Sequence, residues 1–101
     1  RRLQRALPAD QACDGNDANA CNNLGWLYRN GLGAPKDDVI AAPLFEKACD
    51  AVNKFGCANL AWLYHHGLGL AKNPTKAETL YRRACALGYR EACDSAKGVK
   101  R

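Results

Sequence analysis

Several features that mark common classes of protein are absent from this chain of 101 residues. No apolar run approaches the roughly 20 residues that a transmembrane helix requires, so we expect no membrane insertion. Methionine is missing and no secretion signal is visible, which indicates a processed chain or an excised fragment. The net charge is only +5, and no basic stripe is interleaved with aromatic residues, so we expect no nucleic-acid partner.

Catalytic motifs are also scarce. Ser95 is the only serine, and Gly98 rather than a lysine lies three positions later, so the S-x-x-K element of serine hydrolases is missing. His65 and His66 are adjacent, and on a helix they would point about 100° apart, a poor arrangement for one metal ion. Three glutamates with basic neighbours are expected on the solvated face of second helices: Glu46, Glu78 and Glu91. We therefore expect no enzyme activity, no metal and no cofactor.

Cysteine, in contrast, is abundant and regular. The six cysteines form three pairs with a spacing of eight, and the pairs recur every 36 residues: Cys13 and Cys21, Cys49 and Cys57, Cys85 and Cys93. Residues 20–55 and 56–91 are identical at 14 of 36 positions, far above chance. A period between 20 and 50 residues indicates a stacked repeat architecture.

Each repeat is predicted to contain two helices. Residues 20–30 carry an apolar stripe with helical spacing, and Gly31 ends it. The second helix is expected over residues 38–51 and, in the next repeat, from Pro74 after an Asn73 cap. Proline inside a helix removes a backbone donor, so Pro43 should kink or delay its helix without breaking the fold. Pro8 should likewise disturb a helix in the first segment.

The repeat predicts one domain over residues 1–101. It divides into a partial repeat (1–19), two full repeats (20–55 and 56–91) and a second partial repeat (92–101). This organisation suggests that the chain was cut from a longer array. The sequence leaves the oligomeric state open.

The cysteine spacing also predicts the disulfide pairing. On one continuous helix, eight residues would separate two cysteines by about 12 Å, whereas a disulfide needs Cα atoms within about 7 Å. A chain reversal over residues 50–56 would bring partners together, so we expect the local pairs Cys13–Cys21, Cys49–Cys57 and Cys85–Cys93. Structural zinc sites usually space cysteines two to four apart, and a C-x-x-C redox motif is absent. Such a framework indicates an oxidising compartment.

The segments 23–33, 36–37 and 41–49, with their copies at 59–69 and 77–85, resemble the Sel1-like repeat. The Cys-x7-Cys spacing is similar to the cysteine-rich branch typified by the Helicobacter cysteine-rich proteins. This resemblance implies an all-α, right-handed superhelical solenoid of antiparallel helix pairs, similar to tetratricopeptide arrays. It also implies protein–protein interaction or scaffolding in a periplasmic or secreted bacterial protein. Some cysteine-rich members are described as penicillin-binding proteins or β-lactamases, so a hydrolase is the alternative function.

A helical wheel points to a binding face opposite the apolar stripe of the first helices. Its expected residues are Asn22, Asn23, Trp26, Arg29, Asn30, Asn59, Trp62, His65 and His66. Tryptophans with polar neighbours are frequent protein-binding anchors, and the set suits an extended acidic or backbone-exposing segment. Two structural alternatives remain open. Trp26 and Trp62 could pack against neighbouring repeats, and Asn23 and Asn59 could bond only to the preceding turn.

Overall fold

The computed structural model describes residues 13–15 and 17–99 of the chain. Every regular element of this part is an α-helix: α3 (Ala18–Asn30), α4 (Asp38–Asp50), α5 (Lys54–His66), α6 (Pro74–Ala86) and α7 (Arg90–Gly98). The prediction of an all-α fold is confirmed. Most of the expected N-terminal partial repeat, including Pro8, lies outside the described residues.

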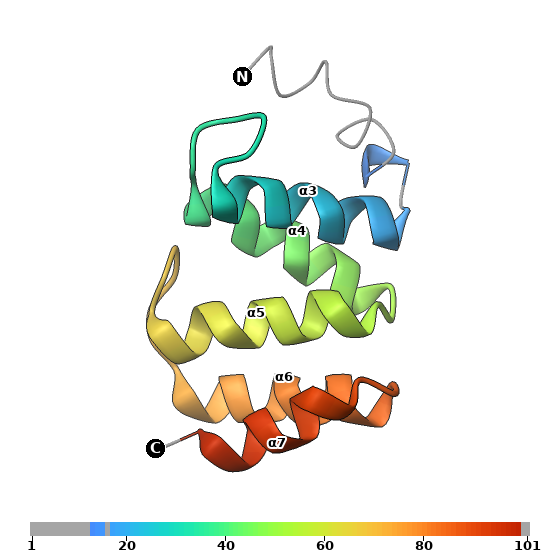
Figure 1. Cartoon of the computed structure of the whole chain (residues 1–101), viewed down its shortest axis with the longest axis vertical. Helices are drawn as coiled ribbons and strands as arrows, with labels where there is room; N and C mark the ends of the chain where they lie inside the picture. The colour runs from blue at the N-terminus through green and yellow to red at the C-terminus, as the bar shows by residue number, and fades with distance from the viewer. Residues whose placement is uncertain (1–12, 16, 100–101) are drawn as a thin grey trace.

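The helices form one stack. Each helix packs against the next one along the chain, and α3 also contacts α5 directly. Figure 1 shows the resulting ladder, which runs from α3 to α7 along the longest axis of the molecule. The first helices of the repeats are therefore α3, α5 and α7, and the second helices are α4 and α6. This order is that of a solenoid of helix pairs.

Each of the four long helices begins with an Asp or Asn cap. The side chains of these caps accept a hydrogen bond from a backbone N–H three residues later; they are Asp17, Asp37, Asn53 and Asn73. The caps recur with the repeat, at 17 and 53 before the first helices and at 37 and 73 before the second. Tyr89 takes the corresponding place before α7 and forms no side-chain cap bond. The start of α7 thus lacks an interaction that stabilises the starts of α3, α4, α5 and α6.

Pro43 does not delay or interrupt its helix. Helix α4 begins at Asp38, directly after its Asp37 cap, and continues unbroken through Pro43 to Asp50. The expected delay of this helix is therefore wrong, and the expected survival of the fold is confirmed. Pro43 is exposed, and so is Val39, whose carbonyl would otherwise accept the missing N–H. Water can reach that carbonyl, which explains why the helix tolerates the proline.

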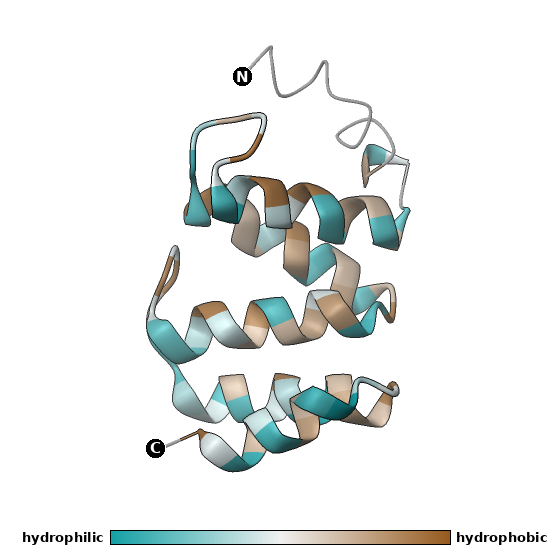
Figure 2. Cartoon of the chain, in the orientation of Figure 1, coloured by the Kyte–Doolittle hydropathy of each residue, from teal (hydrophilic) through white to brown (hydrophobic). Residues whose placement is uncertain are grey.

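The core consists of two clusters that follow one another along the stack. One joins α3, α4 and α5 around Leu24, Phe45 and Leu63, and the other joins α5, α6 and α7 around Tyr81. A Cβ atom on Gly25 would lie 2.7 Å from the Phe45 ring, so only glycine permits this helix contact. Figure 2 shows hydrophilic and hydrophobic residues alternating along each helix, as amphipathic packing requires. None of the helices in the described segments has the length and apolar character needed to cross a bilayer.

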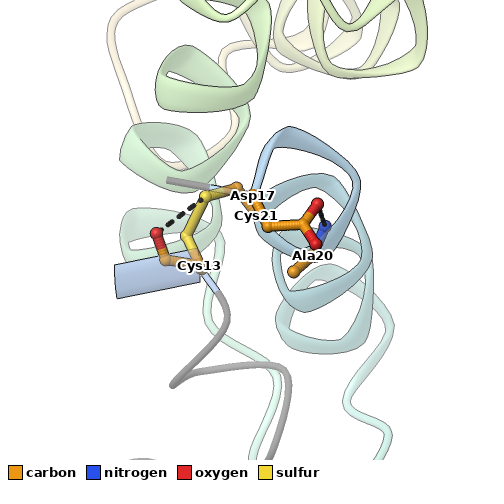
Figure 3. The surroundings of a disulfide bond; sticks show 4 residues. All are labelled: Cys13, Asp17, Ala20 and Cys21. Carbon is orange, nitrogen blue, oxygen red and sulfur yellow. Dashed lines mark hydrogen bonds between the residues drawn. A yellow bond between two sulfur atoms is a disulfide. The ribbon is translucent and has the colours of Figure 1, made fainter. Parts of the chain in front are cut away.

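Disulfides join α4 to α5 and α6 to α7, and a third one joins Cys13 to α3. The bonds are the predicted ones: Cys13–Cys21, Cys49–Cys57 and Cys85–Cys93. Their Cα atoms lie 4.5, 4.5 and 4.8 Å apart, because the chain reverses between the partners. Between α4 and α5 the reversal occupies only residues 51–53, which is shorter than predicted. Figure 3 shows the first bond beside the Asp17 cap, which accepts the Ala20 N–H at 3.2 Å.

Candidate binding face

The contact between α3 and α5 places predicted residues of successive repeats side by side. Asn59 Nδ2 donates a hydrogen bond to Asn22 Oδ1 at 2.9 Å, and Arg29 Nη1 donates to Asn59 Oδ1 at 3.2 Å. The three side chains form a polar chain that crosses from one repeat to the next. The predicted face is thus built partly from interactions between the repeats themselves.

The same arrangement brings three aromatic rings and one guanidinium together at one end of α5. The Arg29 guanidinium lies over the Trp62 ring, with its carbon 3.7 Å from the ring centroid. The His66 ring lies 4.4 Å from the Trp62 ring, and the His65 and His66 rings are 4.8 Å apart. The expectation that the two histidines point apart is wrong for the rings. Their Cβ atoms diverge by helix geometry, but rotation about the side-chain bonds returns the rings toward each other.

This cluster carries positive electrostatic potential. Partial burial lowers the pKa of Arg29, while nearby Asp38 opposes the change, and the guanidinium remains charged because arginine does not deprotonate in proteins. Burial, His65, Arg29 and Lys72 together lower the pKa of His66. Its ordinary value of about 6.5 already leaves most of the ring neutral at pH 7, and the lowering increases that share. The fixed positive charge beside Trp62 is therefore that of Arg29.

The structure distinguishes the two tryptophans. Trp26 is 45% exposed, as expected for a residue that faces a partner. Trp62 is partly buried against the core and covered by Arg29 of the preceding repeat, as the structural alternative requires. The difference arises because α5 has a first helix before it, whereas no first helix precedes α3 within residues 13–15 and 17–99. Trp62 therefore packs against the preceding repeat, whereas Trp26 is accessible and its role as a binding anchor stays a prediction.

The asparagines also occupy different environments. Asn59 bonds to the preceding first helix, which is neither of the two roles considered for it. Its repeat equivalent, Asn23, is exposed. Asn30 is exposed and donates to the Trp26 carbonyl oxygen at 2.9 Å, a bond within its own helix. Asn23, Trp26 and Asn30 therefore remain accessible, while Asn22, Arg29 and Asn59 are fixed by their mutual bonds.

A groove of about 240 Å³ extends this face from α5 toward α7. Its lining comprises Arg29, Phe55, Ala58, Asn59, Trp62, Tyr81, Tyr89, Glu91, Ala92 and Ser95. Partial burial raises the pKa of Tyr81 and of Tyr89, so both phenols keep their proton at neutral pH. The groove thus combines aromatic surface with the Arg29 guanidinium and the Glu91 carboxylate, and the Tyr89 side chain is hydrogen-bonded to Glu91.

Sequence reasoning missed the aromatic residues of this groove. Phe55 and Tyr89 contact each other with ring centroids 5.0 Å apart. They depart from the repeat, because Phe55 corresponds to Asn19 and Glu91, and Tyr89 corresponds to Asn53. Aromatic residues at positions that are polar in the other repeats were the available signal. A search for residues that recur in each repeat overlooks positions where one repeat differs from the others.

The residues considered as catalytic candidates all lie on helices. Ser95 Oγ donates to the Glu91 carbonyl oxygen at 3.2 Å. Glu46 and Glu91 are exposed, as expected, although Glu91 lies on the first helix α7. Glu78 departs from the expectation, because it is buried and pairs with Arg82 at 2.6 Å. Within the described part of the chain, no three His, Cys, Asp or Glu side chains form a group that could hold a metal ion.

Comparison with known families accounts for this arrangement. The family described as "Sel1 repeat" matches residues 18–53 and 55–89. The chain belongs to the Sel1 repeat family. Sel1 repeats are tetratricopeptide-like modules that generally serve as protein-interaction scaffolds. No curated protein matches the chain.

Solved structures support the same assignment. Cysteine-rich protein B of Helicobacter pylori is 36% identical over 85% of this chain and 65% of its own, with a TM-score of 0.81. A Sel1 repeat protein from Oxalobacter formigenes is 31% identical over 87% of this chain and 34% of its own, with a TM-score of 0.76. A protective antigen of uropathogenic Escherichia coli is 27% identical over 83% of this chain and 18% of its own, with a TM-score of 0.80. The Sel1 chain thus spans less than two thirds of each of these proteins. Its disulfides indicate an oxidising location outside the cytosol.

Proposed function

We propose that this Sel1 chain is a non-catalytic module that holds an extended acidic protein segment across α3, α5 and α7. The observation that carries the proposal is the Arg29 guanidinium, which lies on Trp62 beside the groove and is bonded to the neutral Asn59. We propose a periplasmic or secreted location for it, in keeping with the disulfides.

Arg29 has the properties of a carboxylate receptor. It is partly buried, and no carboxylate forms an ion pair with it within residues 13–15 and 17–99. Asp38 is close enough to influence it, but Asp38 Oδ2 already pairs with Lys36 at 3.0 Å. Stacking on Trp62 and the bond to Asn59 hold the guanidinium in place before a partner arrives. A preorganised guanidinium loses little side-chain freedom when it binds a carboxylate.

Trp26 would supply the apolar part of the contact. It is 45% exposed and lies on α3, the same helix as Arg29. An extended segment that places a carboxylate on Arg29 would continue over Trp26 in one direction and into the groove in the other. Large aromatic anchors and arginine are the residue types that most often dominate the energy of protein interfaces.

The test uses a fluorescein-labelled peptide of alternating glutamate and leucine, and a second peptide with glutamine in place of glutamate. We expect the fluorescence anisotropy titration to show that Arg29→Gln weakens binding of the glutamate peptide at least tenfold. Binding of the glutamine peptide should not change. Arg83→Gln removes an exposed charge on α6 and serves as the matched control. Equal losses for the two arginine variants would reject a specific site and indicate general charge attraction.

The tryptophan variants separate anchoring from packing. Trp26→Ala should weaken peptide binding by about 2 kcal/mol, roughly thirtyfold, with little change in melting temperature. Trp62→Ala should lower the melting temperature as well, because Trp62 is partly buried. If Trp26→Ala leaves binding unchanged, the segment does not cross α3 as proposed.

The absence of catalysis is part of the proposal and has its own test. Ser95 forms a bond within its own helix and has no lysine in the S-x-x-K position. We expect no hydrolysis of the chromogenic β-lactam nitrocefin above the rate in buffer. Measurable turnover that disappears in Ser95→Ala would establish the hydrolase alternative instead.

A further inference from the structure

The three disulfides differ in accessibility. Cys13, Cys21, Cys49 and Cys57 are between 0% and 2% exposed. Cys85 and Cys93 are both partly exposed. Cys21 and Cys57, the first-helix cysteines of the first two bonds, belong to the two buried core clusters.

A cavity of about 410 Å³ lies beside the accessible bond. Its lining comprises Glu78, Arg82, Cys85, Ala86, Cys93, Ala96, Lys97 and Val99. The volume is in the range of small-molecule sites. Two cations, Arg82 and Lys97, border it, and the single acid, Glu78, is paired with Arg82 at 2.6 Å. The cavity is therefore net positive and contains a disulfide in its wall.

We propose that Cys85–Cys93 is a thiol-exchange site for small anionic thiols. The incoming thiolate attacks the sulfur of Cys85, the bond between Cys85 and Cys93 breaks, and Cys93 leaves as a thiolate. One sulfur–sulfur bond forms as one breaks, and the electron pair of the broken bond stays on Cys93. A second thiol can then attack the mixed disulfide, which releases a small-molecule disulfide and leaves the protein dithiol.

The direction of attack follows from the positions of the two cysteines. Cys93 is the fourth residue of α7, near the positive end of the helix dipole, whereas Cys85 is next to the last residue of α6. A thiolate is stabilised near a helix N-terminus and destabilised near a C-terminus. The more stable thiolate is the better leaving group, so Cys93 leaves and Cys85 carries the added thiol. Lys97 and Arg82 attract an anionic reagent into the cavity.

The exchange would also affect the groove, and this consequence rests on the proposed function. Helix α7 has no side-chain cap and contributes only small side chains to the core, Ala92 and Ala96. It also supplies Glu91 and Ser95 to the wall of the 240 Å³ groove, next to its N-cap residue Tyr89. Opening the bond would loosen α7 and remove that wall.

The test treats the fully oxidised chain with 2-mercaptoethanesulfonate, an anionic thiol, or with cysteamine, a cationic one. Reaction is stopped with N-ethylmaleimide, and peptides are mapped by mass spectrometry. Each rate is divided by the rate of the same thiol with a small-molecule disulfide. We expect the third bond to react at least tenfold faster than the other two. The added thiol should be on Cys85 and the maleimide on Cys93, and the anionic thiol should be favoured over the cationic one.

Lys97→Gln should reduce the preference for the anionic thiol, whereas Lys72→Gln, in an exposed loop, should leave it unchanged. Circular dichroism on each variant checks that the fold is intact. Uniform reaction of all three bonds, or reaction only at the rate of global unfolding, would overturn the exchange site. The acidic peptide of the binding test should bind more weakly after exchange. Unchanged peptide binding alongside selective exchange would reject the α7 wall in the proposed function and leave the exchange site supported.

Discussion

At the residue scale, the backbone of Val52 is the clearest departure from what its residue type prefers. Val52 has a φ of 63°, in the left-handed region, and it is the only non-glycine residue with positive φ in the described part of the chain. A β-branched residue is rare there, because its side chain crowds the backbone. The equivalent residue one repeat later is Gly88, with a φ of 108°. The corner geometry is therefore the same, but only one repeat has the residue type that suits it.

Val52→Gly should stabilise the protein by about 0.5–1 kcal/mol. Removing the left-handed strain returns about 1–2 kcal/mol, and the added freedom of glycine in the unfolded chain takes back about 0.5–1 kcal/mol. Val52 is 62% exposed, so little packing is lost. The control is Val39→Gly in α4, where Val39 is 67% exposed and helical. That variant should be destabilised in urea denaturation, and a stability loss in both variants would show that Val52 is not strained.

At the element scale, α4 and α6 are equivalent helices of successive repeats that differ in sequence. Both start after a cap, at Asp38 and Pro74, and both have 13 residues. Position 43 in α4 is proline, whereas the equivalent in α6 is Thr79, whose Oγ1 donates to the Thr75 carbonyl oxygen at 3.1 Å. Helix length is thus determined by the caps and the packing of the apolar face, and one unfavourable interior residue does not change it.

Pro43→Thr should stabilise the protein by about 1–2 kcal/mol. An interior proline costs about 3 kcal/mol through its missing N–H and its clash with the preceding turn, and the greater freedom of threonine in the unfolded chain offsets part of the gain. The measurement is the free energy of unfolding in urea. Thr79→Pro is the reciprocal variant and, by the same reasoning, should lose about 1–2 kcal/mol. If Pro43→Thr has no effect, the helix has already relaxed around the proline.

At the scale of the whole molecule, stability depends on contacts between neighbouring repeats. The two core clusters meet along α5, where Cys57 and Ala61 belong to one cluster and Leu60 and Leu63 to the other. The bond Cys49–Cys57 links α4 to α5 at this junction, whereas Cys85–Cys93 holds only α7 to the end of the described stack. In such a linear architecture, a central link affects all repeats and a terminal link affects its neighbour.

Replacing both Cys49 and Cys57 with alanine should lower the free energy of unfolding by about 2.5 kcal/mol, the loop-closure entropy of a link of this length. Replacing both Cys85 and Cys93 should lower the free energy of the cooperative unfolding transition by less, because α7 can detach before the rest unfolds. Urea denaturation followed by circular dichroism measures both. Equal losses for the two double variants would mean that α7 unfolds together with the core. Unchanged thermal unfolding in strong reductant would mean that the disulfides contribute nothing.

Much of the fold could be predicted from the sequence because its signals are local and repeated. The cysteine spacing predicted the pairing, since a disulfide tolerates only a short range of Cα distances. Gly31 and Asn73 marked helix ends through backbone and capping preferences that do not depend on distant residues. The effect of Pro43 could not be judged this way, because it depends on whether the freed carbonyl is exposed.

The sequence by itself therefore determined the repeat, the helix pairs, the disulfides and the amphipathic faces, all of which follow from periodicity and short-range geometry. Only the tertiary structure decided which members of the predicted face are available. Trp26 and Trp62 are equivalent in sequence, yet only Trp62 has Arg29 of a preceding repeat to cover it. Accessibility depends on which helix lies next to a residue in the stack. Two equivalent residues thus differ in exposure within the part of the chain that the structure describes.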